Sequence, residues 1–254
     1  MRILGLTAAL AIVSLFAFLA GSANAVTINP YVSGKVSMAE GQLTEKILHN
    51  YQAVAPDQIA DADSQELSDR TFGTVRGYLA FGLEAPQPVL HGALRFEMEL
   101  GFGGSEDFQV TTRDFPNDPA HLKVKATTLF ANAFYDFHAT EKIKPYFGAG
   151  LGLARLSFDM NWSVSEPDDG VDRFFINKSE SFNNFAYHLG AGVAYNLTEN
   201  IALDLGYRYT DYGKVSMSSL NMVDAGGQIF IGSINDMKVS LHQNEVMLGL
   251  RYTF

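Results

Sequence analysis

The sequence predicts an all-β protein: an eight-stranded, antiparallel, up-and-down transmembrane β-barrel that follows a cleaved N-terminal signal peptide. Three observations lead to this prediction. Apolar side chains recur at every second position in eight segments, and the connections between these segments alternate strictly between long and short. In addition, the first 25 residues have the composition of a secretory signal.

Residues 1–25 predict export from the cytoplasm. Arg2 provides a basic start, an apolar run continues to Ala20, and Ala23-Asn24-Ala25 is a small-residue cleavage site. The alternative is an uncleaved membrane anchor, because the run is long enough to span a bilayer. The cleavage site and the lack of flanking charge favour removal. The mature chain, residues 26–254, then has a length that suits one large all-β domain.

The composition excludes several classes of protein. The chain contains no cysteine, so disulfides, thiol catalysis and thiolate metal sites are excluded. Its formal charge is −10 at pH 7, and an acidic surface is a poor partner for nucleic acid, which needs clustered Lys and Arg. After Ala25, no run approaches the roughly 20 apolar residues of a spanning helix. A membrane protein is still compatible with this sequence if only every second residue faces lipid.

The period-two pattern divides the mature chain into eight expected strands. The seventh is the clearest, because Leu203, Leu205 and Tyr207 alternate with Asp204 and Arg208. The expected strands cover residues 27–38, 71–84, 90–102, 122–138, 144–158, 182–196, 200–213 and 242–254.

The connections support an outer-membrane barrel. The long ones cover 39–70, 103–121, 159–181 and 214–241, and the short ones cover 85–89, 139–143 and 197–199. In an up-and-down barrel all long loops then lie on one side, as outer-membrane barrels require. A soluble β-sandwich or a lipocalin-like barrel would also alternate. However, the second face of these strands holds Arg, Glu, Asp, Gly and Ser, which make a poor apolar core, so the apolar face is expected to meet lipid.

Three stretches resemble a known superfamily: "PYFGAGLGLARL", "YHLGAGVAYNLTENIALDLGYRYTDYG" and the terminal "LGLRYTF". They are similar to the Opa/OmpA-like eight-stranded outer-membrane barrels, which include bacterial surface antigens. In such families a C-terminal strand that ends in Phe is read by the barrel-assembly machinery. The resemblance therefore implies that Leu250, Tyr252 and Phe254 form the assembly signal. Taken alone, Phe254 is also explained as an aromatic at the membrane interface.

The alternation predicts a charged barrel interior, because an eight-stranded barrel is filled by side chains or holds one small ligand. The inward set comprises Lys35, Arg76, Arg95, Arg208 and Arg251, opposed by Glu84, Glu97, Glu99, Asp136, Asp204 and Glu245. Buried charges require partners. We interpret the set as a salt-bridged plug; the alternative is a narrow pore or gate.

Strand order predicts particular pairs within this set. Arg76 is expected beside Glu97 or Glu99, and Asp204 at the height of Arg251. Closure of the barrel is expected to bring Glu245 towards Lys35.

Arg155 interrupts the apolar face of its strand, because alternation points it outward with Leu151 and Leu153. We place it at the outer rim, where it could meet lipopolysaccharide phosphates. The alternative is a β-bulge that turns it inward.

The four long loops together carry a net charge of −12, which leaves +1 for the rest of the mature chain. Long loops on a rigid scaffold are where binding function usually lies. They predict contact with a host receptor or matrix protein, with solvation and repulsion as the alternative. Apolar loop residues are candidate anchors, or extend the strands as hairpins above the membrane: Trp162, Phe174, Phe175, Ile229 and Phe230.

No catalytic constellation, cofactor motif or metal site is expected. His242 follows Ser240 by two residues, but "HQNE" departs from the His-x-Ser-Asn pattern of the lipid A deacylases. His188 faces the interior without a serine partner, and His49 and His121 lack the acidic pairs of an omptin protease. The predicted function is a surface antigen or adhesin that also supports envelope integrity. The alternative is a narrow, porin-like channel for small solutes. Expected partners are outer-membrane lipid and lipopolysaccharide, the assembly machinery and a host molecule.

Overall fold

The computed structural model describes residues 28–49, 63–89, 92–110, 120–165, 173–217, 220–224 and 230–254. Every regular element in these ranges is a β-strand. The strands are β1 (Asn29–His49), β2 (Asp63–Val89), β3 (Gly92–Gly103), β4 (Glu106–Val110), β5 (Ala120–Phe137), β6 (Ile143–Ser165), β7 (Arg173–Asn196), β8 (Ile201–Met217), β9 (Leu220–Asp224) and β10 (Phe230–Thr253). No helix among the described residues is long and apolar enough to cross a membrane.

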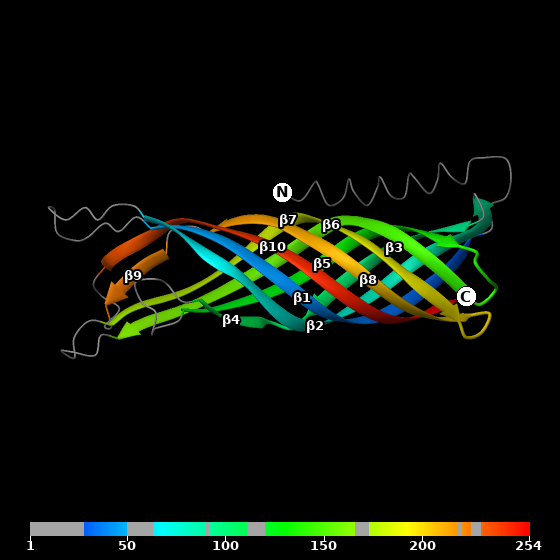
Figure 1. Cartoon of the computed structure of the whole chain (residues 1–254), viewed down its shortest axis with the longest axis horizontal. Coiled ribbons are helices and arrows are strands. Elements are labelled where there is room, and N and C mark those ends of the chain that lie inside the picture. The colour runs from blue at the N-terminus through cyan, green and yellow to red at the C-terminus, as the bar shows by residue number, and fades with distance from the viewer. Residues whose placement is uncertain are drawn as a thin grey trace.

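Eight long strands form a closed antiparallel barrel (Figure 1). Neighbours in the sheet follow chain order, and β10 closes on β1 through a register that runs from Tyr31↔Thr253 to Leu48↔Asn235. The two short strands belong to the same wall, since β4 pairs with β5 above β3, and β9 pairs with β10 and β7 above β8. The fold class expected from the sequence is therefore confirmed.

The strands are longer than the expected segments. β1 and β2 stay paired as far as His49↔Asp63, and β6 and β7 as far as Ser165↔Arg173. The ranges 39–70 and 159–181, expected as loops, are thus largely tall hairpins, and strand also occupies parts of 103–121 and 214–241. β6 has 23 residues, whereas about 9–11 residues cross a bilayer. The expected signal peptide, residues 1–25, lies outside the described residues.

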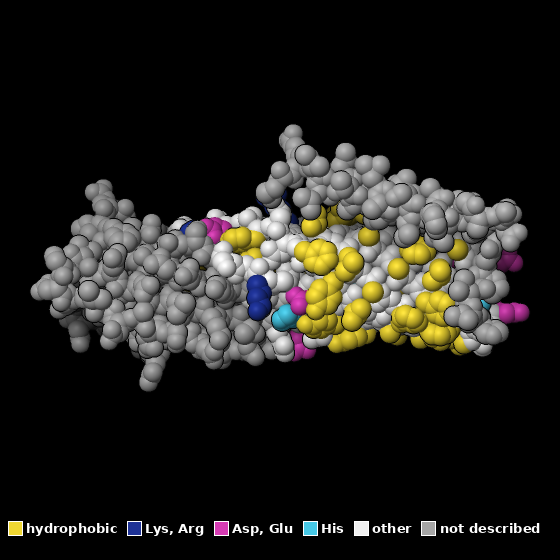
Figure 2. Space-filling model, turned by 90° about the horizontal axis from the view of Figure 1, so that it is seen from above, with side chains coloured by type: hydrophobic (Ala, Val, Ile, Leu, Met, Phe, Trp, Pro, Cys, Tyr) yellow, Lys and Arg dark blue, Asp and Glu magenta, His cyan; other side chains and the backbone are white. Residues whose placement is uncertain are grey.

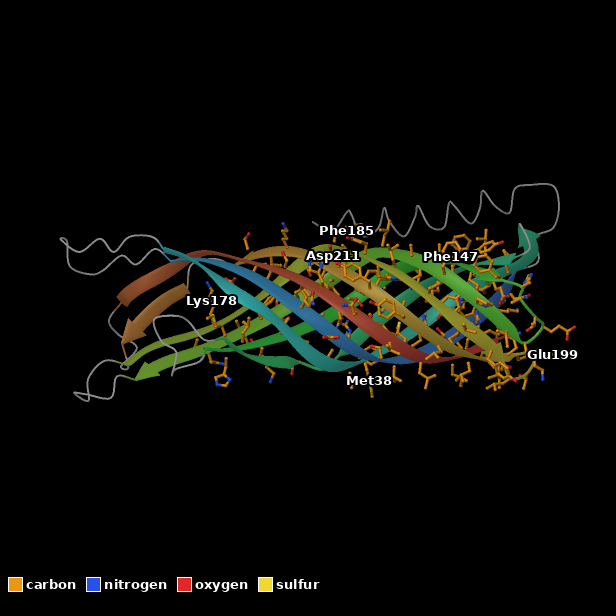
Figure 3. The ribbon with its side chains drawn as sticks, viewed as in Figure 1. Met38, Phe147, Lys178, Phe185, Glu199 and Asp211 are labelled. Carbon is orange, nitrogen blue, oxygen red and sulfur yellow. The ribbon has the colours of Figure 1, made fainter. Side chains whose placement is uncertain are left out.

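The outer surface of the barrel carries an apolar band next to the short turns. Figure 2 shows hydrophobic side chains gathered over this part of the surface. On β6 the band runs from Ile143 to Leu153 and includes Phe147, Leu151 and Leu153, each more than half exposed. Phe147 and Phe185 both point away from the barrel in Figure 3. So much exposed apolar surface, spread over neighbouring strands, identifies the lipid-facing part of the wall.

The two faces of the wall exchange character beyond this band. Arg155 and the outward residues that follow it on β6 are polar, whereas Leu156 and Phe158 point inward and are fully buried. β5 changes at the same height, because Leu129 points outward but Leu122 and Val124 point inward. We call the strand portions beyond Leu129, Leu153 and Phe185 the extension. It has the polarity of a water-soluble barrel, with an apolar core and a polar surface.

Candidate functional site

The centre of the barrel interior holds a continuous network of buried charges. Lys35 Nζ lies 2.6 Å from Glu97 Oε1 and 2.7 Å from Glu99 Oε2. Arg208 joins two further carboxylates, with Nη1 at 2.6 Å from Glu99 Oε1 and Nη2 at 2.7 Å from Glu245 Oε2. These groups come from four strands around the wall, β1, β3, β8 and β10. Each charge has an opposite charge within hydrogen-bond distance, as burial in this setting requires.

A second group lies closer to the short turns. Arg95 donates to both oxygens of Asp136, at 2.6 and 2.9 Å. Arg251 lies nearby, with Nη2 at 3.6 Å from Asp204 Oδ1 and Nη1 at 3.9 Å from Asp136 Oδ2. The expected proximity of Asp204 and Arg251 is therefore present. Glu84, also expected inside, lies 3.9 Å from Lys144.

Two expected pairings are wrong. Arg76 does not meet Glu97 or Glu99. Its guanidinium donates to Tyr212 Oη at 3.0 Å and to Gln243 Oε1 at 3.3 Å, and lies 3.8 Å from Glu245. Glu245 does not meet Lys35 but accepts from Arg208, Ser37 and Tyr78. The strands are tilted and staggered, so side chains meet across the barrel at heights that chain order alone does not specify.

Polar uncharged residues complete the network, and the sequence analysis did not single them out. The Asn132 side-chain amide donates to Glu97 at 3.0 Å, and its Oδ1 lies within hydrogen-bond distance of His188 Nε2, at 2.8 Å. Tyr31 donates to Glu97 at 3.1 Å, and Tyr212 donates to Gln243 at 2.5 Å. The period-two alternation places these residues on the inward face, and this was the signal from which they could have been found. His188 thus fills the interior as a hydrogen-bonded residue.

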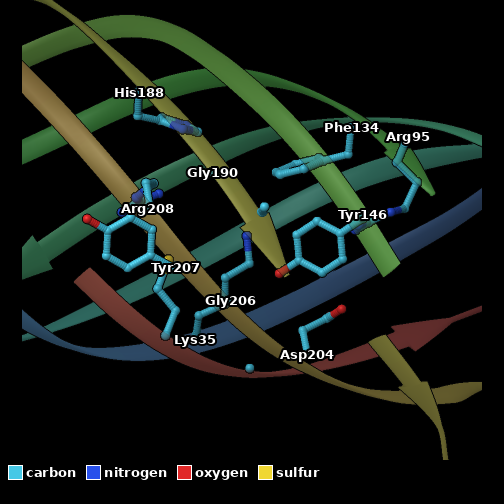
Figure 4. A pocket seen from close by; sticks show the side chains of 13 residues that line it. Lys35, Arg95, Phe134, Tyr146, His188, Gly190, Asp204, Gly206, Tyr207 and Arg208 are labelled. Atoms are coloured by element: carbon cyan, nitrogen blue, oxygen red, sulfur yellow. The ribbon is translucent and has the colours of Figure 1, made fainter. Parts of the chain in front are cut away.

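Glycines on the wall make room for this filling. A Cβ at Gly150 would lie 2.2 Å from both Asn132 Oδ1 and His188 Nε2, and a Cβ at Gly192 would lie 2.6 Å from the ring of Tyr146. A cavity of about 30 Å³ is left among the described residues and is bordered by Lys35, Tyr146, His188, Asp204 and Arg208 (Figure 4). That volume accommodates one or two water molecules.

The extension closes the barrel a second time. Leu122, Val124, Leu156, Phe158 and Met160 point inward there, and each is at most 5% exposed. The rings of Phe158 and Phe182 pack edge to face with centroids 5.9 Å apart. The described interior is therefore filled by side chains at two levels, the charged network at the level of the membrane and the apolar layer in the extension.

The C-terminus is held in the sheet. The Phe254 amide donates to Pro30 O at 3.0 Å, so the last residue pairs with the first strand. Leu250, Tyr252 and Phe254 point outward in the apolar band at 53%, 45% and 66% exposure. Tyr252 and Phe254 contact edge to face at 5.3 Å.

The candidate loop anchors lie mainly on strands. Backbone pairing joins Trp162 to Ile176 and Val164 to Phe174 in the β6–β7 hairpin, which also holds Phe175, and Phe230 begins β10. The hairpin interpretation of this segment therefore holds for these residues. Ile229 lies outside the described residues.

His242 belongs to a polar group at the outer rim. Its Nδ1 lies 3.0 Å from the Tyr209 hydroxyl and 3.6 Å from Asp211 Oδ2, and its ring stacks on Tyr209. The direct opposition of His242 and Asp211 in the β8–β10 register was not foreseen. No group of three or more His, Asp or Glu suited to a metal ion occurs among the described residues.

A closed barrel with an apolar outer band, a charged interior and short turns at one end is an outer-membrane β-barrel. Residues 8–254 match the model of the outer membrane protein beta-barrel domain, and the chain belongs to this family. The family and the location in the bacterial outer membrane, both expected from the sequence, are thereby confirmed.

Two relatives and one solved structure illustrate what this chain is similar to. Outer membrane protein PagN of Salmonella typhimurium is 31% identical over 231 residues, which cover 88% of this chain and 89% of PagN. A putative adhesin of Rickettsia conorii, RC1281, is 24% identical over 165 residues, covering 63% of this chain and 61% of that protein. The crystal structure of Neisserial surface protein A aligns over 89% of this chain and 97% of that chain, with 19% identity and a TM-score of 0.43.

Proposed function

We propose that this outer-membrane barrel is a surface adhesin and antigen that acts by binding rather than by catalysis. The observation that carries the proposal is the height of its hairpins. The lipid-facing band on β6 ends at Leu153, yet the β6–β7 ladder continues to Ser165↔Arg173. A paired, apolar-cored extension is a rigid mount for the segments at its tip, which suits presentation to a partner on another surface.

The character of the hairpins supports the same proposal. Aromatic and aliphatic residues near their ends, among them Trp162, Phe174, Phe175, Ile229 and Phe230, would provide anchors for a host receptor or matrix protein. The surrounding acidic residues would give the contact its charge selectivity. The name of RC1281 as a putative adhesin points in the same direction.

The barrel itself would contribute to envelope integrity. Outer-leaflet lipid, including lipopolysaccharide, is the proposed environment of the apolar band. We propose that the assembly machinery recognises Leu250, Tyr252 and Phe254, which form an exposed apolar row at the end of the chain, on and just after β10.

The competing function is a narrow channel for small solutes. The ion-paired layer around Arg208 and the apolar layer around Phe158 both argue against conduction, since a solute would have to pass two filled levels. Planar bilayer recordings test this directly. Closed, silent membranes are expected, and stable conductance steps from the folded barrel would favour the channel.

The adhesion proposal is tested by displaying the barrel on a non-adherent bacterium and counting attachment to host cells and to immobilised matrix proteins. One strain carries the complete chain, and another has the β1–β2 and β6–β7 hairpins shortened. Each shortened hairpin ends at a directly opposed pair, Gly41↔Phe72 or Ser157↔Ser181, so that strand register is kept. A matched control keeps the hairpins but has residues 50–62 replaced by a neutral polar sequence of equal length.

Attachment of the complete chain that disappears with the hairpins is the expected result. Loss in the control as well would assign the contact to residues 50–62. If verified surface barrels of both kinds fail to attach, the adhesin proposal is wrong and a role in the envelope alone is favoured.

A further inference from the structure

A cluster of unpartnered cations lies on the outer wall directly above the lipid-facing band. Arg155 is the first outward residue after Leu153 on β6, and Lys125 follows Thr127 on the neighbouring strand β5. Thr127 is directly opposite Arg155, and Lys125 is opposite Ser157. Lys125 and Arg155 are therefore diagonal neighbours on one face, with Cβ atoms about 7–8 Å apart. The ladder is continuous here and all these residues point outward, so the bulge alternative for Arg155 is wrong.

The cations of this cluster lack the ion-pair and hydrogen-bond partners that the cations described inside the barrel have. In the part of the chain that the structure describes, Lys123, Lys125 and Arg155 make no hydrogen bond or ion pair. Lys123 is opposite Asp159 on β6 and opposite Asp107 on β4, and Asp159 accepts a hydrogen bond at 2.5 Å from Ser179. Lys125 and Arg155 have no acidic residue opposite them and are flanked by hydroxyl and amide groups of Thr127, Ser157, Ser181 and Asn183. Asp159 is diagonal to Lys125 on the other side, but it accepts from Ser179 and forms no ion pair with Lys125. Two cations that make no ion pair, with hydroxyl and amide groups beside them, form an arrangement suited to a phosphate.

The opposite wall has a different charge. In the order of the eight long strands, the β5–β6 pair lies across the barrel from the β10–β1 pair. There, Met38 points outward on β1 and is 76% exposed, and the next outward residue is Glu40. On β10, Val246 is followed outward by Asn244 and His242. The rim is therefore cationic on one side and anionic or neutral on the other.

We propose that Lys125 and Arg155, flanked by Lys123, bind the phosphate groups of outer-leaflet lipid. The height of these cations above the apolar band favours lipid phosphate as the ligand. The cations begin one outward position above Leu153, a rise of about 6.6 Å along the strand, where the headgroups of lipid in contact with Leu129 and Leu153 must lie. The proposal depends on the membrane orientation of the barrel and not on the adhesin function, so either can fail alone. It also gives the barrel a preferred lipid contact on the β5–β6 wall.

The test uses the full chain refolded in neutral detergent micelles and titrated with diphosphorylated lipid A or with the same lipid after removal of both phosphates. Native mass spectrometry counts the bound lipids. Each cation near an anionic lipid surface contributes about fivefold in affinity. The double variant Lys125→Gln/Arg155→Gln is therefore expected to lose about 25-fold in affinity for the phosphorylated lipid and to bind the dephosphorylated lipid unchanged.

Two controls separate this site from general charge effects. Lys214→Gln removes an exposed cation from β8 on another wall, and Lys125→Arg keeps the charge within the cluster. Both are expected to bind the phosphorylated lipid within about twofold of the unchanged chain, since the charges of the cluster are kept. The heat-dependent gel mobility of each folded barrel shows that the variants remain folded.

Three results would overturn the proposal. The double variant could retain full affinity for phosphorylated lipid, or Lys214→Gln could weaken binding equally. Inorganic phosphate or a sulfated heparin fragment could also bind the cluster at least as tightly as the lipid, which would assign it to a free anion or a soluble glycan.

Discussion

Arg95 and Asp136 form a two-point ion pair inside the barrel, with both carboxylate oxygens accepting from the guanidinium at 2.6 and 2.9 Å. The two residues lie on adjacent strands, β3 and β5, and both side chains are almost completely buried. The pair therefore joins neighbouring strands where water cannot replace either partner.

Arg95→Ala should strongly destabilise the barrel. It leaves the Asp136 carboxylate buried without its main partner, and loss of one member of such a pair costs about 3–5 kcal/mol. Urea unfolding of the variant in lipid vesicles, followed by tryptophan fluorescence or gel mobility, measures the change. Lys214→Ala, which alters an exposed side chain, should change the unfolding free energy by less than about 0.5 kcal/mol. An Arg95→Ala barrel as stable as the unchanged chain would show that the network does not hold the fold together.

Gly150→Ala should also destabilise the barrel. The added methyl group would lie 2.2 Å from both Asn132 Oδ1 and His188 Nε2, so the buried hydrogen-bonded pair must move. Overpacking of this kind costs about 1–3 kcal/mol. Gly73→Ala is the matched control, because a Cβ at that strand glycine meets no atom within 4 Å. Equal unfolding free energies for the two variants would contradict the packing described around His188.

An arginine scan along the outer face of β6 should locate the edge of the lipid. Ala149→Arg places a charge near the middle of the apolar band and should cost about 2–4 kcal/mol. Ser157→Arg places the same charge beyond Arg155 and should cost about 0–1 kcal/mol. Reversible unfolding in vesicles gives both values. A similar cost at the two positions would mean that the bilayer also covers the extension, beyond Leu153.

Phe254→Ser should lower the amount of folded barrel in the outer membrane while leaving the purified protein able to fold. The change removes an exposed aromatic side chain but keeps the backbone hydrogen bond to Pro30 O. Quantitative blotting of outer-membrane fractions, with refolding of the same variant from urea, distinguishes assembly from stability. Thr253→Ser is the neighbouring control. If refolding and membrane levels of Phe254→Ser fall together, the residue acts through stability, as an interface aromatic would.

Within the lipid-facing part of the barrel, the sequence by itself determined which face of each strand is apolar, because side chains in a strand alternate with a period of two. Hence Glu99 and Arg208 were assigned to the interior and Leu250, Tyr252 and Phe254 to the outside, as the structure has them. The number of long strands and their up-and-down order followed from the same pattern and from the alternating lengths of the connections.

Only the tertiary structure decided which charges meet. Arg76 is opposite Gly103 in the β2–β3 register, well displaced from Glu97 and Glu99, and it reaches Tyr212 and Gln243 instead. Barrel stagger sets these heights, and it depends on all strands together. The length of the strands could not be predicted from the sequence either, because it also depends on the environment of the folded barrel. At Arg155 the apolar positions of β6 change to the other face, which in a single sequence reads as the end of a strand. The folded chain shows the same strand leaving lipid for water, where the inner face has to be the apolar one.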